Sequence, residues 1–213
     1  MAEAPIFCEE DYYTRKSEYA LAAMVVADHN LRIRFMDVGF VGSTHDTRVW
    51  HNSKLSQNPD EYFKDGEYLL GDKGYPISKQ LITPYKEPHA SIPQNAAFNY
   101  FLSKPRVRIE HTIGVLKGRF QSLRGLRVSI GRGKDIKKDQ ARAVFWINAC
   151  VLLHNFLIED GNPYEWMSDN SDNTDSTAQN NQDIMEDDIF STGDEKRTYL
   201  KHIVLEYNRF FEI

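Results

Sequence analysis

The sequence predicts an α/β domain, and three observations support this class. In residues 31–35 (LRIRF), three apolar side chains alternate with two arginines, which is the period of a strand with one buried face. The apolar stretch 67–70 (EYLL) runs into GDKGYP, a turn sequence typical of a strand end. Residues 106–123 and 137–158 carry apolar side chains at helical spacing. Strands and helices therefore alternate along one chain.

The N-terminal part of the domain is predicted to contain an antiparallel hairpin. Residues 19–27 and 31–40 are apolar runs that flank the turn-forming sequence Asp28-His29-Asn30. A helix is predicted to start near Thr44, because small and capping residues precede the next apolar positions. It is predicted to end at Asn58-Pro59-Asp60.

Two short strands and a longer helix are expected next. The strands are predicted at 67–70 and 81–85, and residues 86–99 are interpreted as an irregular insertion. The helix is predicted over 106–123. Its apolar stripe consists of Ile109, Ile113, Leu116, Phe120 and Leu123. At about 100° per residue, Glu110 falls at the edge of this stripe and can point toward a neighbouring strand end.

The second long helix, 137–158, is predicted to be buried, because its later half is apolar all round. Its apolar run, 143–158, is too short to span a bilayer. Within it, we interpret His154 and Asn155 as core residues with satisfied hydrogen bonds. Trp50, Trp146 and Trp166 are interpreted as packing residues.

Three regions result. Residues 1–160 form the domain, and residues 161–195 form an acidic linker rich in Asn, Asp, Ser and Thr, a composition typical of disorder. Residues 196–213 are predicted to form a C-terminal helix that docks back. Its apolar positions are Leu200, Ile203, Val204 and Tyr207.

The charge is unevenly distributed. The net charge of −5 argues against a nucleic-acid partner for the chain as a whole, yet residues 104–142 hold 12 basic and 3 acidic side chains, and residues 143–195 hold no Lys or Arg. Such a basic stretch suits a phosphate backbone, although a solvated helix face has the same composition. The candidates for backbone contact are Arg106, Arg108, Lys117, Arg119 and Arg124.

The two cysteines and the hydropathy bound the class of protein. Cys8 and Cys150 are far apart, and Cys150 sits in an apolar run, so we expect a buried free thiol and a reducing compartment. The N-terminus has no apolar signal stretch. A mean hydropathy of −0.56 is low for a compact domain and predicts that part of the chain is unfolded.

Three carboxylates are the candidates for chemistry: Asp46 at a helix start, Asp72 at a strand end and Glu110 on a helix. Groups at such positions project from a rigid scaffold. Oxygen ligands without Cys or paired His favour Mg²⁺ or Mn²⁺. Each residue also has a simpler explanation. Asp46 can favour the helix dipole, Asp72 can form a turn, and Glu110 can pair with a nearby arginine on its own helix.

Five segments decide between these readings. The strings VGSTHDTRVWHNSKL, YLLGDKGYP, LITPYK, RVRIEHTIGVLKGRFQSLRGLR and INACVLLHNFLIEDG, in that order, resemble the DDE nuclease domain of PIF/Harbinger-type transposases and their domesticated derivatives. The resemblance covers about residues 12–160. It implies an RNase H-like fold, a mixed sheet flanked by helices. It also implies that Asp72 is the second catalytic Asp, that Glu110 is the catalytic Glu, and that Asp46 is a further acid near the metal.

One family feature is not matched. In the family, the first catalytic Asp sits in an Asp-Gly-Thr-type motif on the first strand, and no such motif occurs here. Asp11, Asp28 and Asp37 are weak substitutes. We therefore expect an incomplete site and a sheet that lacks all or part of its first central strand, unless residues 4–8 supply it. Two unpaired internal strand edges would result.

Two functions follow from the resemblance. The first is a divalent-metal-dependent DNA endonuclease or transposase domain that cleaves phosphodiester bonds through an Asp/Asp/Glu site with Mg²⁺ or Mn²⁺. The alternative is an inactive domesticated or degenerate derivative that binds DNA or protein. The resemblance further implies DNA as partner, a nuclear location and a Myb-like partner protein. A homo-oligomer is compatible with it, and no membrane association is expected.

Overall fold

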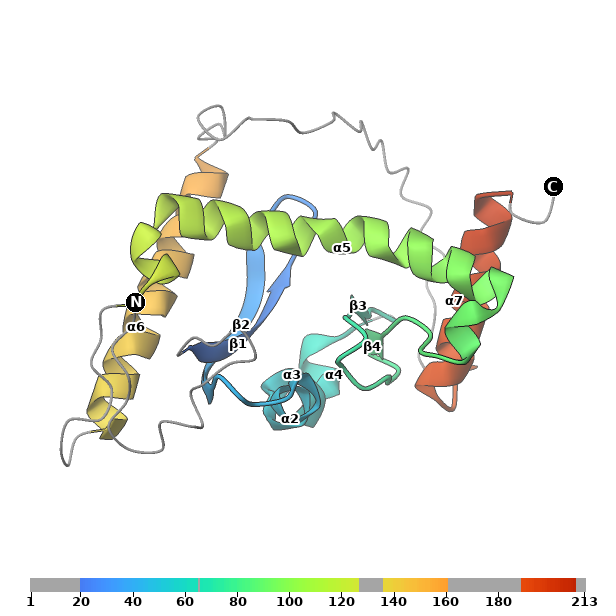
Figure 1. Ribbon diagram of the computed structural model, residues 1–213, viewed down its shortest axis with the longest axis horizontal. Helices are drawn as coiled ribbons and strands as arrows, with labels where there is room; N and C mark the ends of the chain where they lie inside the picture. Colours follow the sequence, from blue (N-terminus) through green and yellow to red (C-terminus); the bar gives the residue numbers. More distant parts are fainter. Residues whose placement is uncertain (1–19, 65, 127–135, 161–188, 210–213) are drawn as a thin grey trace.

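The computed structural model describes residues 20–64, 66–126, 136–160 and 189–209, and its element order agrees with an α/β domain (Figure 1). The long helix α5 extends across the molecule, with α7 packed at one of its ends and α6 at the other, and the strands lie beneath it. The strands are β1 (Leu21–Ala27), β2 (Ile33–Val41), β3 (Leu69–Leu70) and β4 (Leu81–Ile82). The helices are α2 (Asp46–Asn52), α3 (Lys54–Gln57), α4 (Pro59–Tyr62), η1 (His89–Ser91), α5 (Pro93–Arg119), η2 (Gln121–Arg124), α6 (Ile136–Glu159) and α7 (Gly193–Tyr207).

The predicted hairpin is confirmed. Strands β1 and β2 pair antiparallel, with Met24 opposite Asp37. The turn between them is held by Asp28, whose Oδ1 accepts the backbone N–H groups of Asn30 and Arg32 at 2.9 and 3.0 Å. Leu31 adopts a φ of 63°, which lets the chain reverse within this turn. The expected Asp-His-Asn turn therefore forms because the Asp28 carboxylate accepts backbone N–H groups that have no backbone carbonyl partner among the described residues of the turn.

The other two strands form a separate parallel pair. Strand β3 pairs with β4, and among the described residues no strand joins this pair to the hairpin. The described strands thus form two small sheets instead of one mixed sheet. Both pack into one cluster, which includes Met24 from β1, Leu81 from β4 and Trp50 from α2. Residues 4–8, the possible substitute for the first strand, lie outside the described residues.

The predicted helix from Thr44 to residue 58 is divided into three. Helix α2 ends at Asn52, and the Ser53 side chain then caps α3 by accepting the N–H of Ser56 at 3.3 Å. Pro59 occupies the first turn of α4, so it starts a helix instead of ending one. The three short helices wrap Trp50 and Leu55 into the core, where a single straight helix would point them in different directions.

The interpretation of residues 86–99 as an irregular insertion is wrong for its second half. Helix α5 begins at Pro93, continues through Pro105 and ends at Arg119. Its 27 residues span about 40 Å at 1.5 Å per residue. Its early turns are held by tertiary contacts, because Phe98 and Leu102 are buried in one cluster with Leu200 of α7. Packing against α7 therefore stabilises the early turns of this helix, whose first position Pro93 favours, and the missing N–H of Pro105 does not end it.

The inner face of α6 docks on the hairpin as predicted. His154 is fully buried, and its Nε2 donates to the Leu31 carbonyl oxygen at 2.9 Å. The Asn155 amide donates to the Ile33 carbonyl at 2.8 Å, and its oxygen accepts the Ile33 N–H at 2.9 Å. Cys150 is a buried free thiol, and burial raises its pKa despite the opposing hydrogen bond with Ser122.

The outer face of α6 contradicts the prediction of a buried helix. Phe145, Leu152 and Phe156 are 73, 71 and 63% exposed. The all-round apolar pattern fails as a guide here, because no other described element covers this side. By length and composition alone, residues 138–159 could also cross a membrane.

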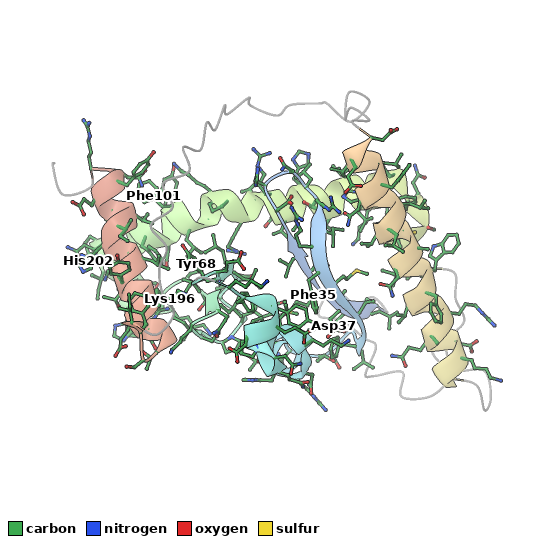
Figure 2. All side chains as sticks on the ribbon, turned by 180° about the vertical axis from the view of Figure 1, so that it is seen from behind. Phe35, Asp37, Tyr68, Phe101, Lys196 and His202 are labelled. Atoms are coloured by element: carbon green, nitrogen blue, oxygen red, sulfur yellow. The ribbon has the colours of Figure 1, made fainter. Side chains whose placement is uncertain are left out.

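The predicted C-terminal helix is confirmed and starts earlier, at Gly193. Thr192 and Glu195 form a reciprocal capping box there, with Thr192 Oγ1 accepting the Glu195 N–H at 3.2 Å. Fully buried Lys196 docks the helix, because its Nζ donates to the Gly66 carbonyl at 3.0 Å and lies 5.0 Å from the Tyr68 ring (Figure 2).

Two of the four apolar positions expected to dock α7 face solvent instead. Ile203 and Tyr207 are 42 and 86% exposed, whereas Leu200 is buried and Val204 is half-buried. Leu205, which lies outside the predicted stripe, is buried as well. The predicted linker from residue 161 to residue 188 lies outside the described residues.

Candidate active site

Asp72 lies two residues beyond the end of β3, in agreement with the predicted strand-end position. Its Oδ1 accepts the N–H of Lys73 at 2.6 Å and lies 3.3 Å from Nη2 of Arg106 on α5. The side chain is 54% exposed. Buried Gly71 precedes it, and a Cβ there would lie 2.8 Å from Leu81 Cδ1. The glycine therefore lets β3 approach β4 closely, which places Asp72 at the end of the parallel pair.

Asp46 is the first residue of α2, and its carboxylate reaches the turn that follows Asp72. A Cβ on Gly74 would lie 2.3 Å from Asp46 Oδ2, so the carboxylate rests against this glycine. Thr47, the next residue of the helix, donates from Oγ1 to the Gly74 carbonyl at 3.3 Å. The helix start and the turn are thus in contact, which sets Asp46 and Asp72 on one region of the surface.

The pKa of Tyr75 is raised by both carboxylates, which shows that they lie near its hydroxyl. Burial raises the pKa of its hydroxyl, the negative charges of Asp46 and Asp72 raise it further, and the result is about 12. The sequence pattern alone did not identify this residue, because Tyr75 looks like an ordinary aromatic in a turn. The charges of both predicted acids act on the pKa of its hydroxyl.

We expect Asp46→Asn and Asp72→Asn each to lower the pKa of Tyr75 from about 12, while burial keeps it above 10.0. A raised tyrosine pKa contributes stability that is complete below the unfolded pKa and is lost as pH rises through the folded one. This contribution therefore disappears between about pH 10 and 12 in the native protein, and over a narrower range in the variants. NMR titration of ring-labelled tyrosine, with Tyr75→Phe for assignment, measures the pKa of Tyr75 in the native chain and in both variants. Equal pKa values in the three proteins would show that the carboxylates do not face this hydroxyl.

Glu110 lies on α5, one helical turn beyond Arg106, and its side chain is exposed. Residues four apart share a helix face, so Glu110 neighbours the arginine that pairs with Asp72. Within the described ranges, however, no three carboxylate, His or Cys side chains gather closely enough to hold a metal ion. The structure brings Asp46 and Asp72 together and leaves Glu110 beside their neighbour, and the metal-ligand role of the three acids stays a prediction.

Of the three acids set aside as weak substitutes, Asp28 and Asp37 keep structural positions, and Asp11 lies outside the described residues. Hydrogen bonds from Arg32 and Arg34 outweigh burial and lower the pKa of Asp28. Burial raises the pKa of Asp37 on β2, against the Lys54 charge and the Val38 N–H. Asp28 is thus committed to the hairpin turn.

The five basic residues proposed for DNA contact have different surroundings. Arg106 pairs with Asp72. Arg119 is half-buried, and after burial its charge helps to lower the pKa of His154, so it points toward the domain interior. Arg108, Lys117 and Arg124 are exposed. Of these three, Lys117 shares the helix face of Arg106 and Glu110, which makes it the best placed for a phosphate beside the acids.

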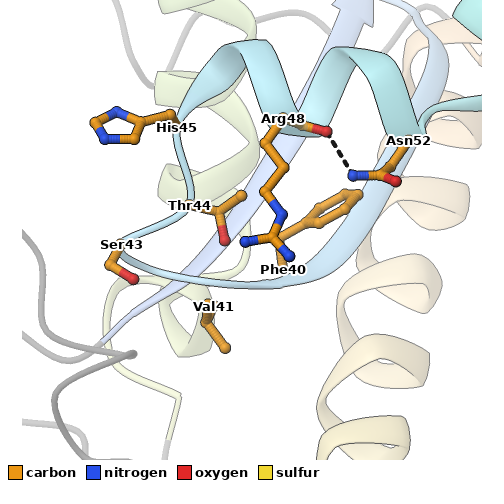
Figure 3. A pocket seen from close by; sticks show the side chains of 7 residues that line it. All are labelled: Phe40, Val41, Ser43, Thr44, His45, Arg48 and Asn52. Carbon is orange, nitrogen blue, oxygen red and sulfur yellow. Dashed lines mark hydrogen bonds between the residues drawn. The ribbon is translucent and has the colours of Figure 1, made fainter.

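A hollow of about 490 Å³ lies where β2 ends and α2 begins. Figure 3 shows Arg48 extending from α2 toward Phe40, while the Asn52 amide donates to the Arg48 carbonyl at 2.7 Å. Five of the seven lining residues have polar side chains, and one of these is an arginine, which suits an anionic group. The lining residues are Phe40, Val41, Ser43, Thr44, His45, Arg48 and Asn52.

Comparison with known proteins decides the family. Residues 6–155, more than half of the chain and including all three acids, match the model described as DDE superfamily endonuclease. The chain belongs to the DDE superfamily endonuclease family. The PIF/Harbinger resemblance is confirmed by relatives whose names carry it.

This DDE domain is similar to several curated proteins. "Putative nuclease HARBI1" of Rattus norvegicus is 27% identical over 159 residues, which cover 75% of this chain and 43% of that protein. The Homo sapiens protein of the same name is 26% identical over the same shares. "Protein ALP1-like" of Arabidopsis thaliana is 27% identical over 157 residues, 68% of this chain and 36% of that protein. The DDE domain thus spans less than half the length of these relatives. No solved structure matches it.

Proposed function

We propose that this DDE domain takes part in divalent-metal-dependent cleavage of DNA phosphodiester bonds, with Asp72, Asp46 and Glu110 as its acids. One observation carries the proposal: Asp46 and Asp72, far apart in the sequence, meet at the Gly74-Tyr75 turn inside the segment that matches the family. Turn formation explains Asp72 alone and helix capping explains Asp46 alone. Neither explains why two acids share one surface.

The donor chemistry fits Mg²⁺ or Mn²⁺, because carboxylate oxygens are the ligands these ions prefer. The described geometry supplies two of the three acids at one turn, and no third ligand joins them there. The described residues therefore do not form a complete metal site, and we derive no step through a bound ion. The RNase H-like arrangement of the whole sheet is likewise part of the proposal.

Arg106 has a definable task at this site. Its guanidinium holds the Asp72 carboxylate from α5 and lies one turn from Glu110. It keeps Asp72 oriented toward the helix that carries the third acid. Arg106 and Lys117 lie on one face of α5, about 16 Å apart along the helix axis, so a DNA backbone that follows this face can contact them through different phosphates. Such contacts fix the register of a duplex without reading its sequence.

A metal titration of the full chain tests the proposal. We expect Mn²⁺ affinity, measured by calorimetry, to fall at least about tenfold in Asp72→Asn and in Asp46→Asn, which is about 1.4 kcal/mol. Asp60→Asn, an exposed acid on α4, is the matched control and should bind as the native chain does. Nicking of supercoiled plasmid with Mg²⁺ or Mn²⁺ should disappear in Asp72→Asn and Glu110→Gln.

Two results would contradict the proposed function. One is equal Mn²⁺ affinity in the native chain and both Asp variants. The other is plasmid nicking that persists in the presence of a chelator. DNA as partner, a nuclear location and a Myb-like partner protein remain proposals that rest on the resemblance to Harbinger-type proteins.

A further inference from the structure

The outer face of α6 is the largest apolar feature that the proposed function leaves unused. Between residues 141 and 160, every exposed position falls on one arc of the helix, roughly 140° wide at about 100° per residue. Its large apolar members are 51 to 73% exposed. These are Phe145, Trp146, Leu152, Leu153 and Phe156. Clusters of this kind mark interaction surfaces.

The spacing along this face is that of a helix–helix seam. Phe145, Ala149, Leu152 and Phe156 follow one another at intervals of four, three and four residues, the alternation that keeps a line of side chains facing a partner helix. The opposite face is already committed, since His154 and Asn155 bond to the hairpin backbone. Side chains of α6 project away from the rest of the molecule at this edge (Figure 2).

The two ends of the face carry opposite charges. At the N-terminal end, Lys138 and Arg142 are exposed, and at the C-terminal end, Glu159 and Asp160 are exposed. Within the chain, Arg142 lies 3.5 Å from Asp139 and Glu159 pairs with Arg32, so a partner helix would share these two charges. A parallel copy of the helix would place like charges together at both ends. An antiparallel copy places basic groups opposite acidic ones at both ends, and the seam of apolar residues between them remains in register.

We propose that this face binds a second copy of the chain, with the two α6 helices packed antiparallel about a two-fold axis. In the central register, Ala149 meets Leu152 of the second copy, Phe145 meets its Phe156, and Arg142 meets its Glu159. Such an interface is self-complementary, as two-fold symmetry requires. The small side chain of Ala149 lets the two helices approach closely at the centre.

A membrane is the competing occupant, and the inner face argues against it. Insertion of α6 into a bilayer would separate Asn155 from the Ile33 backbone and His154 from the Leu31 carbonyl, leaving buried polar groups without hydrogen bonds. The charged groups at both ends of the exposed face fit a partner helix of the same length instead.

Analytical ultracentrifugation of the full chain tests the association. We expect a monomer–dimer equilibrium whose dissociation constant rises at least about tenfold in Leu152→Lys, about 1.4 kcal/mol. The matched control is Ile203→Lys, an apolar residue on α7 that is 42% exposed and lies outside the face. Leu152 is 71% exposed, so the substitution leaves the domain folded, which circular dichroism verifies.

Cross-linking tests the direction of the helices. In a Cys8→Ser background, oxidation of a mixture of Ala149→Cys and Leu152→Cys chains should give a disulfide between the two kinds of chain. Leu152→Cys alone should link poorly, because antiparallel packing sets it against position 149. Efficient linkage of Leu152→Cys to itself would indicate parallel helices and overturn the proposal.

Charge reversal gives a third readout. Arg142→Glu and Glu159→Arg should each weaken the dimer, and the double variant should recover it. Circular dichroism must show that loss of the Arg142–Asp139 and Arg32–Glu159 pairs within the chain leaves each variant folded. A chain that stays monomeric at all concentrations overturns the proposal, as does lipid-vesicle binding by the monomer that Leu152→Lys abolishes. None of these measurements depends on metal binding or DNA cleavage, so they can fail while the proposed function holds.

Discussion

Replacement of Trp50 by alanine is expected to lower the free energy of unfolding by about 3–5 kcal/mol, the range for deletion of a large buried aromatic. Trp50 is 3% exposed and lies in the cluster with Met24 and Leu81, which come from the two separate sheets. No described strand joins those sheets, so this cluster and helix α5, which packs on Ile33 of β2 and on Ile82 of β4, hold them together. Chemical denaturation monitored by circular dichroism measures the change.

Trp146→Ala is the matched control, because it removes the same side chain from an exposed position. Trp146 is 51% exposed and donates one hydrogen bond, at 3.0 Å, to Ser122 Oγ. We expect a loss below about 1 kcal/mol at protein concentrations where the chain is monomeric. Equal losses in the two variants would show that Trp50 does not occupy the core position described.

Asn155→Ala is expected to lower the free energy of unfolding by about 2–4 kcal/mol. The Asn155 amide bonds both backbone groups of Ile33, a residue that is 5% exposed, and alanine would leave both without a partner. Each unsatisfied buried group costs about 1–3 kcal/mol. Amide hydrogen exchange should also accelerate at Ile33, which is the local signature of the lost contact.

Asn99 offers an internal comparison, because its amide bonds both backbone groups of Tyr85 in the same way. Asn99→Ala should therefore also destabilise the chain, through the segment after β4. Asn52 bonds only the Arg48 carbonyl on an exposed helix, so Asn52→Ala should change stability by no more than about 0.5 kcal/mol. A large effect at Asn52 with none at Asn155 would contradict this account.

Local sequence rules predicted most of the secondary structure. The alternation of 31–35, the Asp28 turn and the helical spacing of 137–158 correspond to observed elements, because each depends on contacts within a few residues. The failures depend on distant contacts. The early turns of α5 are stabilised by α7, about a hundred residues away, which covers Phe98 and Leu102. The pattern of α6 could not distinguish a buried face from one left uncovered.

The candidate site divides in the same way. Asp72 at the end of β3 and Asp46 at the start of α2 were predictable from the residues around them, and the five family segments supported their selection. Tyr75 was missed, since the charges that raise its pKa come from two chain segments that only the fold brings together. Arg106 was proposed as a DNA contact, and the structure gives it Asp72 as its partner.

The sequence by itself determined the α/β class and the family and selected the three candidate acids, because these follow from local spacing and from strings of residues. Only the tertiary structure decided that Asp46 and Asp72 share a turn, that Glu110 stands beside their arginine, and that one face of α6 remains apolar and exposed. The physical reason is that convergence and burial are properties of pairs of distant segments. The sequence of one segment specifies its side chains, and the packing of the other segments determines which residues those side chains contact.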